Sequence, residues 1–387
     1  MGGPDVITVD AELLAPLVAG ANRVSRRVDP RDEMLAFASA AAGSSRGAFD
    51  YFRLGHDLDA TVGQIVAWAF PGDEAIAVLE FACGYGRILR HLVARFSPDR
   101  VTASDIDPDA LSFVAAEFGV ATLQSVADPD AIDWPQRFDL IVVPSLFSHL
   151  PDRSFARWIG ALYGLLAPRG VLAFSVHGDH VLGDGSAVDG ILYRPTSEAT
   201  GRLAVDQYGT SYVTEAYVAE RIATATGSDR YRRVERGFWD FQDLYLVTGD
   251  DHRDPAEFSY VRPIRGNVDI VDVDDIDEGR LRLLGWALAD PPGLEVTVRA
   301  GDHQVTTVAE FVPSLDVAAV RGAGYERCRY EIDVDIAACG DDDLLVVTAT
   351  AGDQRACLYV QRLADLRRPR RRPLPRWWRR IRARPKR

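Results

Sequence analysis

A glycine turn and two acidic residues are the part of this chain whose residue types and spacing could do chemistry. The stretch 75–92 reads AIAVLEFACGYGRILRHL: an apolar run, a turn around Gly84 and Gly86, then apolar residues at helical spacing. A strand, turn and helix of this kind leave free N–H groups that can hold a carboxylate, a phosphate or a ribose edge. Glu80 precedes the turn, and Asp105 ends the next apolar run. A carboxylate can accept hydrogen bonds from two ribose hydroxyls at once, so the pair fits a nucleoside that carries an amino acid.

A dinucleotide site is the competing interpretation of the turn. Its fingerprint, G-x-G-x-x-G, would place a third glycine or an alanine at position 89, where this chain has Leu89. The spacing therefore disfavours a nicotinamide enzyme.

Four blocks of sequence resemble the class I S-adenosylmethionine-dependent methyltransferases. They are LEFACGYGR (79–87), ASDIDPDAL (103–111), FDLIVVPSLFSHLPD (138–152) and LLAPRGVLAFSVHG (165–178). The resemblance covers about residues 30 to 249 and is closest to a branch associated with glycan and cell-surface biosynthesis. It implies a Rossmann-like α/β fold with a seven-stranded sheet, and S-adenosyl-L-methionine as cofactor.

The chain departs from the family pattern at three positions. The common aspartate and first glycine of the turn are Glu80 and Ala82 here, and Arg169 stands where a glycine usually precedes Gly170. Glu80 keeps the negative charge, so the resemblance still implies cofactor binding at this turn.

The resemblance assigns cofactor contacts to the turn and to the segments that surround it. Ile106 would offer an apolar face to adenine, and Asp128 would accept its exocyclic amine, although an aspartate before Pro129 can also simply form a turn. Tyr51 and Arg53 would roof the pocket, with Arg53 pairing the cofactor carboxylate; the alternative for Tyr51 is a core aromatic residue. The expected cofactor contacts are Glu80, Phe81, Ala82, Cys83, Gly84, Gly86, Asp105, Ile106, Asp128, Pro144, Tyr51 and Arg53.

Two histidines follow the expected fourth and fifth strands, at the edge where open parallel sheets bind ligands. A neutral imidazole at His149 could take a proton from a substrate hydroxyl, and a structural or cofactor-contact role is the alternative. His177 could contact the substrate, or could form a metal site with Asp179 and His180. No third ligand is fixed by spacing and methyl transfer needs no metal, so we expect no metal site.

Composition limits the classes of function. The 387 residues suit two domains, and no apolar run of about eighteen residues and no signal sequence is visible, so we expect a cytoplasmic protein. Four scattered cysteines are expected to be reduced thiols. The tail 367–387 holds twelve Lys or Arg and no acid, so the preceding residues carry 32 basic and 57 acidic groups. That acidic body disfavours a nucleic-acid partner.

The chain is expected to divide into five parts. Residues 1–30 would be a lead, flexible or forming a first helix, and 31–249 the methyltransferase domain, with a helix at 58–69. A Gly-rich connection, 178–213, would be the lid over the acceptor, contacting it through Tyr193, Arg194 and Tyr208. A linker, 250–265, a β-sandwich, 266–362, and the tail, 363–387, would follow.

The region 266–362 shows short strands about ten residues apart, with Gly, Pro and Asp between them and no helix. This pattern predicts an antiparallel β-sandwich, and it resembles an immunoglobulin-like accessory module found beside glycan-modifying enzymes. Trp286 is expected in its core rather than as a sugar platform.

The tail predicts attachment to the inner face of the plasma membrane. Trp377, Trp378 and Ile381 would share one face of a helix surrounded by arginines, and such residues favour an anionic lipid surface. A disordered basic tail without a partner is the alternative.

These features predict an O-methyltransferase that acts by direct displacement on a sugar or glycan hydroxyl, although a small-molecule or protein acceptor stays open. The alternative is a non-catalytic scaffold with the same fold in a membrane-associated glycan assembly. The intact turn and acid favour the enzyme, because a scaffold has no physical need for them.

Overall fold

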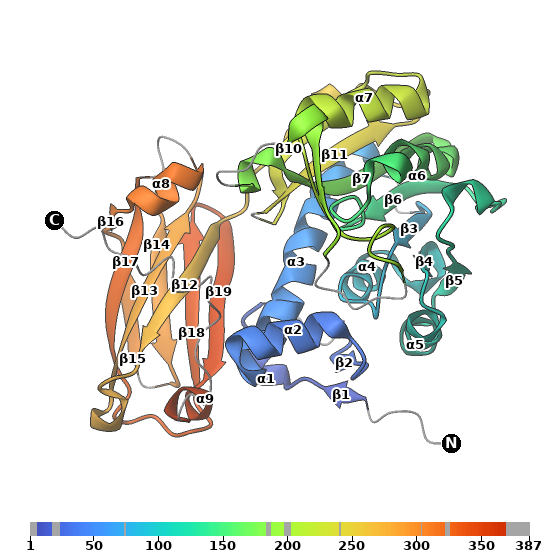
Figure 1. Ribbon diagram of the computed structural model, residues 1–387. Coiled ribbons are helices and arrows are strands. Elements are labelled where there is room, and N and C mark those ends of the chain that lie inside the picture. Colours follow the sequence, from blue (N-terminus) through green and yellow to red (C-terminus); the bar gives the residue numbers. More distant parts are fainter. Residues whose placement is uncertain are drawn as a thin grey trace.

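The computed structural model describes residues 6–17, 24–72, 75–182, 187–196, 203–239, 241–302, 304–321 and 326–368. The basic tail from 369 onwards, with Trp377, Trp378 and Ile381, lies outside the described residues. Figure 1 shows an α/β layer, a two-sheet unit beside it, and the first helices between them.

A mixed, mostly parallel sheet forms the α/β layer. Its strands run in the order β10-β11-β7-β6-β3-β4-β5. Neighbours from β7 to β5 pair in parallel, whereas β11 pairs antiparallel with β7 and β10 with β11. The strands are β3 (Val78–Phe81), β4 (Val101–Asp105), β5 (Ala121–Gln124), β6 (Phe138–Val143), β7 (Leu166–Gly178), β10 (Tyr231–Phe238) and β11 (Gln242–Thr248). A mixed α/β sheet is therefore confirmed.

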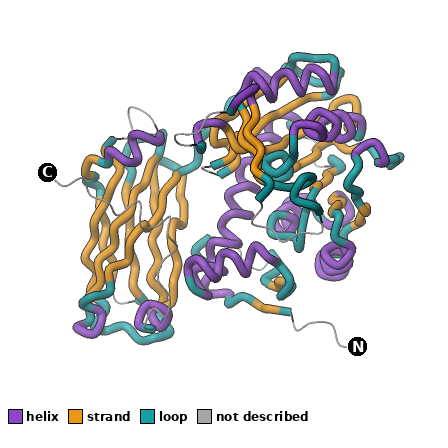
Figure 2. The backbone as a smooth tube through the Cα atoms, in the orientation of Figure 1, coloured by secondary structure: helices purple, strands orange, loops and turns teal. Residues whose placement is uncertain are grey.

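Helices cover both faces of this sheet (Figure 2). Side chains of α4 (Leu89–Phe96) and α5 (Pro108–Phe118) share one apolar core with the sheet, and those of α6 (Asp152–Gly164) and α7 (Glu215–Thr226) share the other. The N-caps Asp107 and Thr214 accept the N–H groups of Asp109 and Tyr217 with their side chains. Pro108 at the first helical position fixes the start of α5.

The Gly-rich connection 178–213, expected to be the lid, holds two additional strands. In its described part, β8 (Ile191–Arg194) pairs antiparallel with β9 (Thr210–Val213), which pairs in parallel with the end of β7. Part of the connection thus extends the sheet, and the sequence analysis did not predict these two strands. Strands this short give little periodicity in the sequence.

The helix expected at 58–69 begins fourteen residues earlier. It is α3 (Ser44–Ala69), and α2 (Glu33–Ala42) precedes it across Gly43, whose φ of 89° turns the chain. The aromatic segment at its start is helical because Phe49 and Phe52 pack into a core with the described part of the lead. The lead contributes β1 (Ile7–Thr8), α1 (Ala11–Leu14) and β2 (Arg27–Val28).

Two four-stranded antiparallel sheets, in the orders β12-β13-β17-β16 and β15-β14-β18-β19, share one apolar core in the C-terminal region. Their strands are β12 (Arg265–Asp272), β13 (Arg280–Leu288), β14 (Glu295–Ala300), β15 (Gln304–Val308), β16 (Val312–Pro313), β17 (Arg327–Asp335), β18 (Leu344–Ala351) and β19 (Gln354–Arg362). A short helix, α9 (Leu363–Arg367), follows β19.

Two expectations for this region were wrong. A helix, α8 (Leu315–Arg321), lies between β16 and β17, and the carbonyl of Ser314, directly before it, accepts the N–H of Ala318. Trp286 is half-buried outside the core, because strand alternation sends Leu283 and Ala287 inward and Trp286 to the opposite face.

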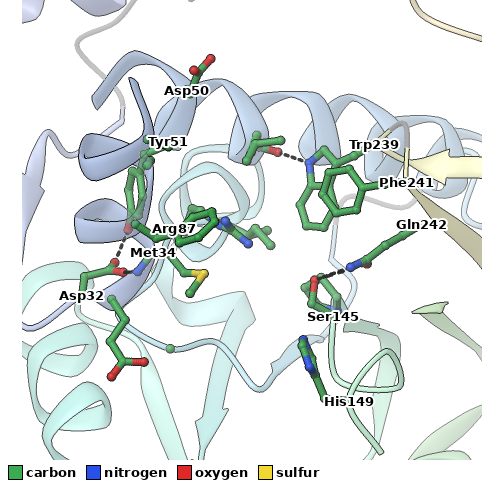
Figure 3. A pocket seen from close by; sticks show the side chains of 18 of the residues that line it. Asp32, Met34, Asp50, Tyr51, Arg87, Ser145, His149, Trp239, Phe241 and Gln242 are labelled. Atoms are coloured by element: carbon green, nitrogen blue, oxygen red, sulfur yellow. Dashed lines mark hydrogen bonds between the residues drawn. The ribbon is translucent and has the colours of Figure 1, made fainter. Parts of the chain in front are cut away.

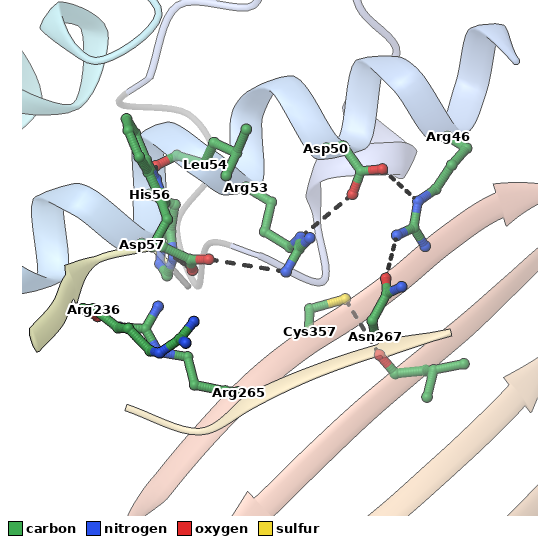
Figure 4. Close-up of polar contacts among 12 residues, drawn as sticks. Arg46, Asp50, Arg53, Leu54, His56, Asp57, Arg236, Arg265, Asn267 and Cys357 are labelled. Atoms are coloured by element: carbon green, nitrogen blue, oxygen red, sulfur yellow. Dashed lines mark hydrogen bonds and ion pairs between the residues drawn. The ribbon is translucent and has the colours of Figure 1, made fainter. Parts of the chain in front are cut away.

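Polar contacts join the first helices to the C-terminal sheets (Figure 4). Arg46 of α3 donates from Nε to Asp50 at 2.6 Å and from Nη2 to the amide oxygen of Asn267 at 3.3 Å. Its guanidinium also lies 4.2 Å from the ring centroid of Tyr359. No helix in the described ranges has the length and apolar character to cross a bilayer.

Candidate active site

A cavity of about 2800 Å³ opens where β3, β4 and β6 end (Figure 3). Typical ligand pockets measure roughly 300–1,000 Å³, so this one has room for a cofactor and a second molecule. Thirteen of the fourteen predicted site residues line it: Glu80, Phe81, Ala82, Cys83, Gly84, Asp105, Ile106, Asp128, Pro144, Tyr51, Arg53, His149 and His177.

The glycine turn is shaped by three residues in left-handed conformations. The φ angles are 62° at Ala82, 52° at Gly84 and 82° at Gly86. A Cβ on Gly84 would meet no atom within 4 Å, which leaves the backbone open to the cavity. Gly86 lies behind the turn, where a Cβ would come 2.6 Å from Cε2 of Phe118. The first glycine therefore provides a cradle and the second lets α5 pack closely.

Asp105 holds the turn against the end of β4. Its Oδ2 accepts the N–H of Gly84 at 2.7 Å, and its Oδ1 accepts the N–H of Asp107 at 2.8 Å. Burial raises the pKa of this carboxyl, and the backbone donors oppose that shift. Each carboxylate oxygen has a second lone pair, so Asp105 can still accept hydrogen bonds from a ribose.

Glu80 is a buried acid with an unused oxygen. Glu80 is 1% exposed, and its Oε2 has no hydrogen-bond partner among the described residues. Burial raises the pKa of Glu80 well above its ordinary value, and the nearby Arg87 acts in the opposite direction. A buried oxygen without a donor is costly, so a cationic amine in the cavity would fit here.

Arg87, directly after the turn, was not among the predicted contacts. It lines the cavity, its guanidinium lies 5.4 Å from the ring centroid of Trp239, and no carboxylate pairs with it within the described residues. Arg53, predicted to meet the cofactor carboxylate, lies 3.4 Å from Asp50 and 4.0 Å from Asp57 on its own helix. Arg87 is therefore the better placed cation, and its position beside the glycines was a signal in the sequence.

Tyr51 and Asp128 take structural roles as well as lining the cavity. Tyr51 is 1% exposed, and its hydroxyl donates to Oδ2 of Asp32 at 2.5 Å, which ties α3 to the start of α2. Asp128 accepts the N–H of Asp130 at 3.3 Å and pairs with Arg157 at the exposed rim. Tyr51 thus has the contacts of a core aromatic residue, and Asp128 those of a turn-forming aspartate, which were the alternatives to a cofactor contact.

His149 is held in one tautomer. Its Nδ1 lies 2.6 Å from the carbonyl oxygen of Gly209, and because a carbonyl only accepts, Nδ1 carries the proton and Nε2 keeps a lone pair. The ring stacks on Tyr208 with centroids 4.6 Å apart. Burial lowers the pKa of His149, so the imidazole is neutral at pH 7. A neutral histidine with a free lone pair at a cavity can act as a general base.

His177 lies beside His149, with ring centroids 6.2 Å apart. Burial lowers the pKa of His177 to about 4. Gln242, 2% exposed, approaches Nε2 of His177 at 3.4 Å and is itself fixed by the hydroxyls of Ser145 and Ser175. Sequence reasoning missed this network because its members come from three different strand ends.

Of the predicted lid contacts, Tyr208 alone lines the cavity. The hydroxyl of Tyr193 donates to the carbonyl of Val205 at 2.6 Å, and Arg194 lies over the ring of Tyr212 at 5.2 Å. His180 lies 3.7 Å from Asp243. In the part of the chain that the structure describes, no three His, Cys, Asp or Glu side chains gather as a metal site would require.

Comparisons with known proteins bear on this site. Residues 79–172 match the model of a methyltransferase domain. The match covers about a quarter of the chain and includes the glycine turn, Asp105 and His149. The comparison with curated proteins found no match.

Solved structures with a similar fold cover about half of this chain. A S-adenosylmethionine-dependent methyltransferase from Clostridium acetobutylicum is 14% identical, with a TM-score of 0.36 over 50% of this chain and 91% of its own. DesVI from Streptomyces venezuelae is 16% identical, with a TM-score of 0.36 over 52% and 92%. The DhpI-SAM-HEP complex is 23% identical, with a TM-score of 0.35 over 55% and 97%. Similarities of this size carry no argument about the acceptor.

The family match and the site geometry agree on the same residues. The matched segment carries the cradle at Gly84, the buried acid Glu80 and the carboxylate of Asp105. The segment 79–172, which matches a methyltransferase domain, therefore carries the residues of the cavity that suit S-adenosylmethionine.

Proposed function

We propose that this protein methylates a hydroxyl of a sugar or glycan, with Nε2 of His149 as the general base. The observation that carries the proposal is the fixed tautomer of His149, whose Nδ1 is bound to the carbonyl of Gly209. A hydroxyl needs to lose its proton as it gains a methyl group, and a neutral imidazole can take that proton.

The residues of the turn would hold the cofactor. Asp105 would accept the ribose hydroxyls, Glu80 would face the amino group, and Arg87 would face the carboxylate. Bound S-adenosylmethionine supplies an activated methyl group. The chain's own contribution is then to align the acceptor hydroxyl, to exclude water and to hold the proton on His149. His177 would contact the acceptor beside it.

The glycan acceptor is supported by the extent of the cavity and by the basic tail. The cavity continues from the turn to β12 of the C-terminal sheets, so an acceptor longer than one small ring has space. Those sheets would be an immunoglobulin-like accessory module, and the domain limits 31–249 and 266–362 stay predictions. Twelve basic residues in 367–387 would attach the protein to an anionic membrane surface, where lipid-linked glycans lie.

A methylation assay with a matched variant tests the proposal. The protein is incubated with S-adenosylmethionine and a panel of glycosides, and S-adenosylhomocysteine is measured over a range of pH. His149→Gln should lower kcat roughly 10²–10⁴-fold without changing the affinity for S-adenosylmethionine. Because the pKa of His149 is lowered, the wild-type rate should fall only below about pH 6.5, as the base becomes protonated. Full activity of His149→Gln would rule out the assigned base.

A further inference from the structure

A row of aromatic rings lines one wall of the cavity. We name Tyr208, His149, His177, Phe241 and Trp239 the aromatic wall. Neighbouring ring centroids along it are 4.6, 6.2, 6.4 and 5.6 Å apart, and each of these rings lines the cavity. Beyond Trp239 the row ends at the guanidinium of Arg87, 5.4 Å away. The wall therefore extends from the base to the residue beside the glycine turn.

Phe241 differs from the rest of the wall in its exposure. One face of its ring stacks on Trp239 with an interplanar angle of 17°. Trp239 is 3% exposed, but Phe241 is 42% exposed. Figure 3 shows both rings at the cavity, above Ser145 and His149 in this view. An exposed phenyl group beside a site is a surface that gains free energy when a ligand covers it.

The backbone after β10 and one hydrogen bond hold Trp239 in place. Its φ is 57°, a strained angle for a bulky residue, and its indole N–H donates to the carbonyl of Leu54 at 2.8 Å. Such strain persists only where surrounding contacts fix it. The support beneath Phe241 is thus rigid, and a ligand that stacks on Phe241 does not need to order it first.

We infer that Phe241 is the platform on which the ring of a pyranose acceptor stacks. The inference rests on the proposed function and specifies its acceptor. A pyranose has an apolar C–H face and a hydroxyl edge: the face suits the negative π face of Phe241, and the edge suits the polar groups of His177 and Gln242 beside it. An acyclic polyol has hydroxyls but no such face. A phenol has a ring face but only one hydroxyl.

Kinetics with three acceptor classes test the platform. Methyl pyranosides, acyclic polyols and simple phenols are compared for the wild type, Phe241→Ala, Phe241→Tyr and Val261→Ala. Val261 is a matched control, because it is 57% exposed and does not line the cavity. Phe241→Ala should raise KM for pyranosides about tenfold, leaving kcat and the Kd of S-adenosylmethionine within about twofold. Phe241→Tyr and Val261→Ala should behave as the wild type.

The outcomes separate the platform from the proposed function. An unchanged pyranoside KM in Phe241→Ala, or an equal loss with polyols, overturns the platform while the proposed function stands. A wild type that binds S-adenosylmethionine and methylates phenols but no pyranoside overturns both. An unchanged Kd of S-adenosylmethionine in Phe241→Ala shows that the variant is folded, so a raised KM reports the acceptor contact.

Discussion

At the scale of single residues, the proposed contact between the buried acid Glu80 and the amino group of the cofactor would make cofactor binding depend on pH. Burial raises the pKa of Glu80, and a bound ammonium group would lower it again. At pH values between the pKa of Glu80 in the complex and that in the free protein, binding of S-adenosylmethionine should therefore release a proton. The affinity should increase as the pH rises towards the pKa of Glu80 in the free protein.

Titration calorimetry in two buffers with different ionisation enthalpies measures that proton. At the same pH, the binding heats measured in the two buffers should differ for the wild type. They should agree for Glu80→Gln, whose side chain cannot ionise. Equal heats in both buffers for the wild type would mean that Glu80 does not face the amino group.

The sequence predicted residues of this site where they follow one another in a local motif. Gly84 and Asp105 could be identified because the turn and the strand end are each defined by adjacent residues. The hydrogen bond between Nδ1 of His149 and Gly209 joins positions sixty residues apart, so the tautomer followed only from the fold. The same holds for Gln242, which reaches Ser145 and His177 across three strands.

At the scale of elements, the two glycines of the turn differ in role: Gly86 allows close packing, and Gly84 leaves the backbone open to the cavity. Gly86→Ala should destabilise the fold by on the order of 3 kcal/mol, because φ is positive and the added Cβ would meet Phe118 at 2.6 Å. Gly84→Ala has the same type of strain but open space, so its cost should be about 1 kcal/mol.

Urea unfolding of the two variants tests this difference. Gly84→Ala serves as the matched control, since it adds the same methyl group two residues away. Equal losses of unfolding free energy would show that contact with Phe118 does not limit position 86.

Element boundaries followed from the sequence where a capping residue marks them. Asp107 and Thr214 fixed the starts of α5 and α7. The start of α3 was missed, because the aromatic residues of its N-terminal half face the lead, β18 and β19, and that burial depends on tertiary packing. Ser314 directly precedes α8, and serine is a common residue before a helix, but the strand periodicity around it obscured that signal.

At the scale of the whole molecule, α3 connects the α/β layer to the C-terminal sheets. Arg46 is 7% exposed and bonds Asp50, Asn267 and the ring of Tyr359. Removing the Arg46 side chain leaves the amide oxygen of Asn267 without its charged donor, whereas Asp50 keeps Arg53 as a partner. Arg46→Ala should therefore lower the unfolding free energy by on the order of 2 kcal/mol.

Denaturant unfolding of the full chain checks this contact. Arg282→Ala is the control, because Arg282 makes its ion pairs with Glu331 and Asp333 on an exposed sheet face, and its midpoint should match the wild type. A midpoint for Arg46→Ala equal to that of Arg282→Ala would show that Arg46 does not join the two parts.

Titration of the full chain with S-adenosylmethionine tests the central claim most directly. The wild type should bind one equivalent, and Asp105→Asn, which keeps an oxygen for Gly84 but loses the charge and one acceptor, should bind at least about tenfold more weakly. Absence of binding by folded wild-type protein, or equal affinity for both proteins, would contradict the assignment of the cofactor to this turn.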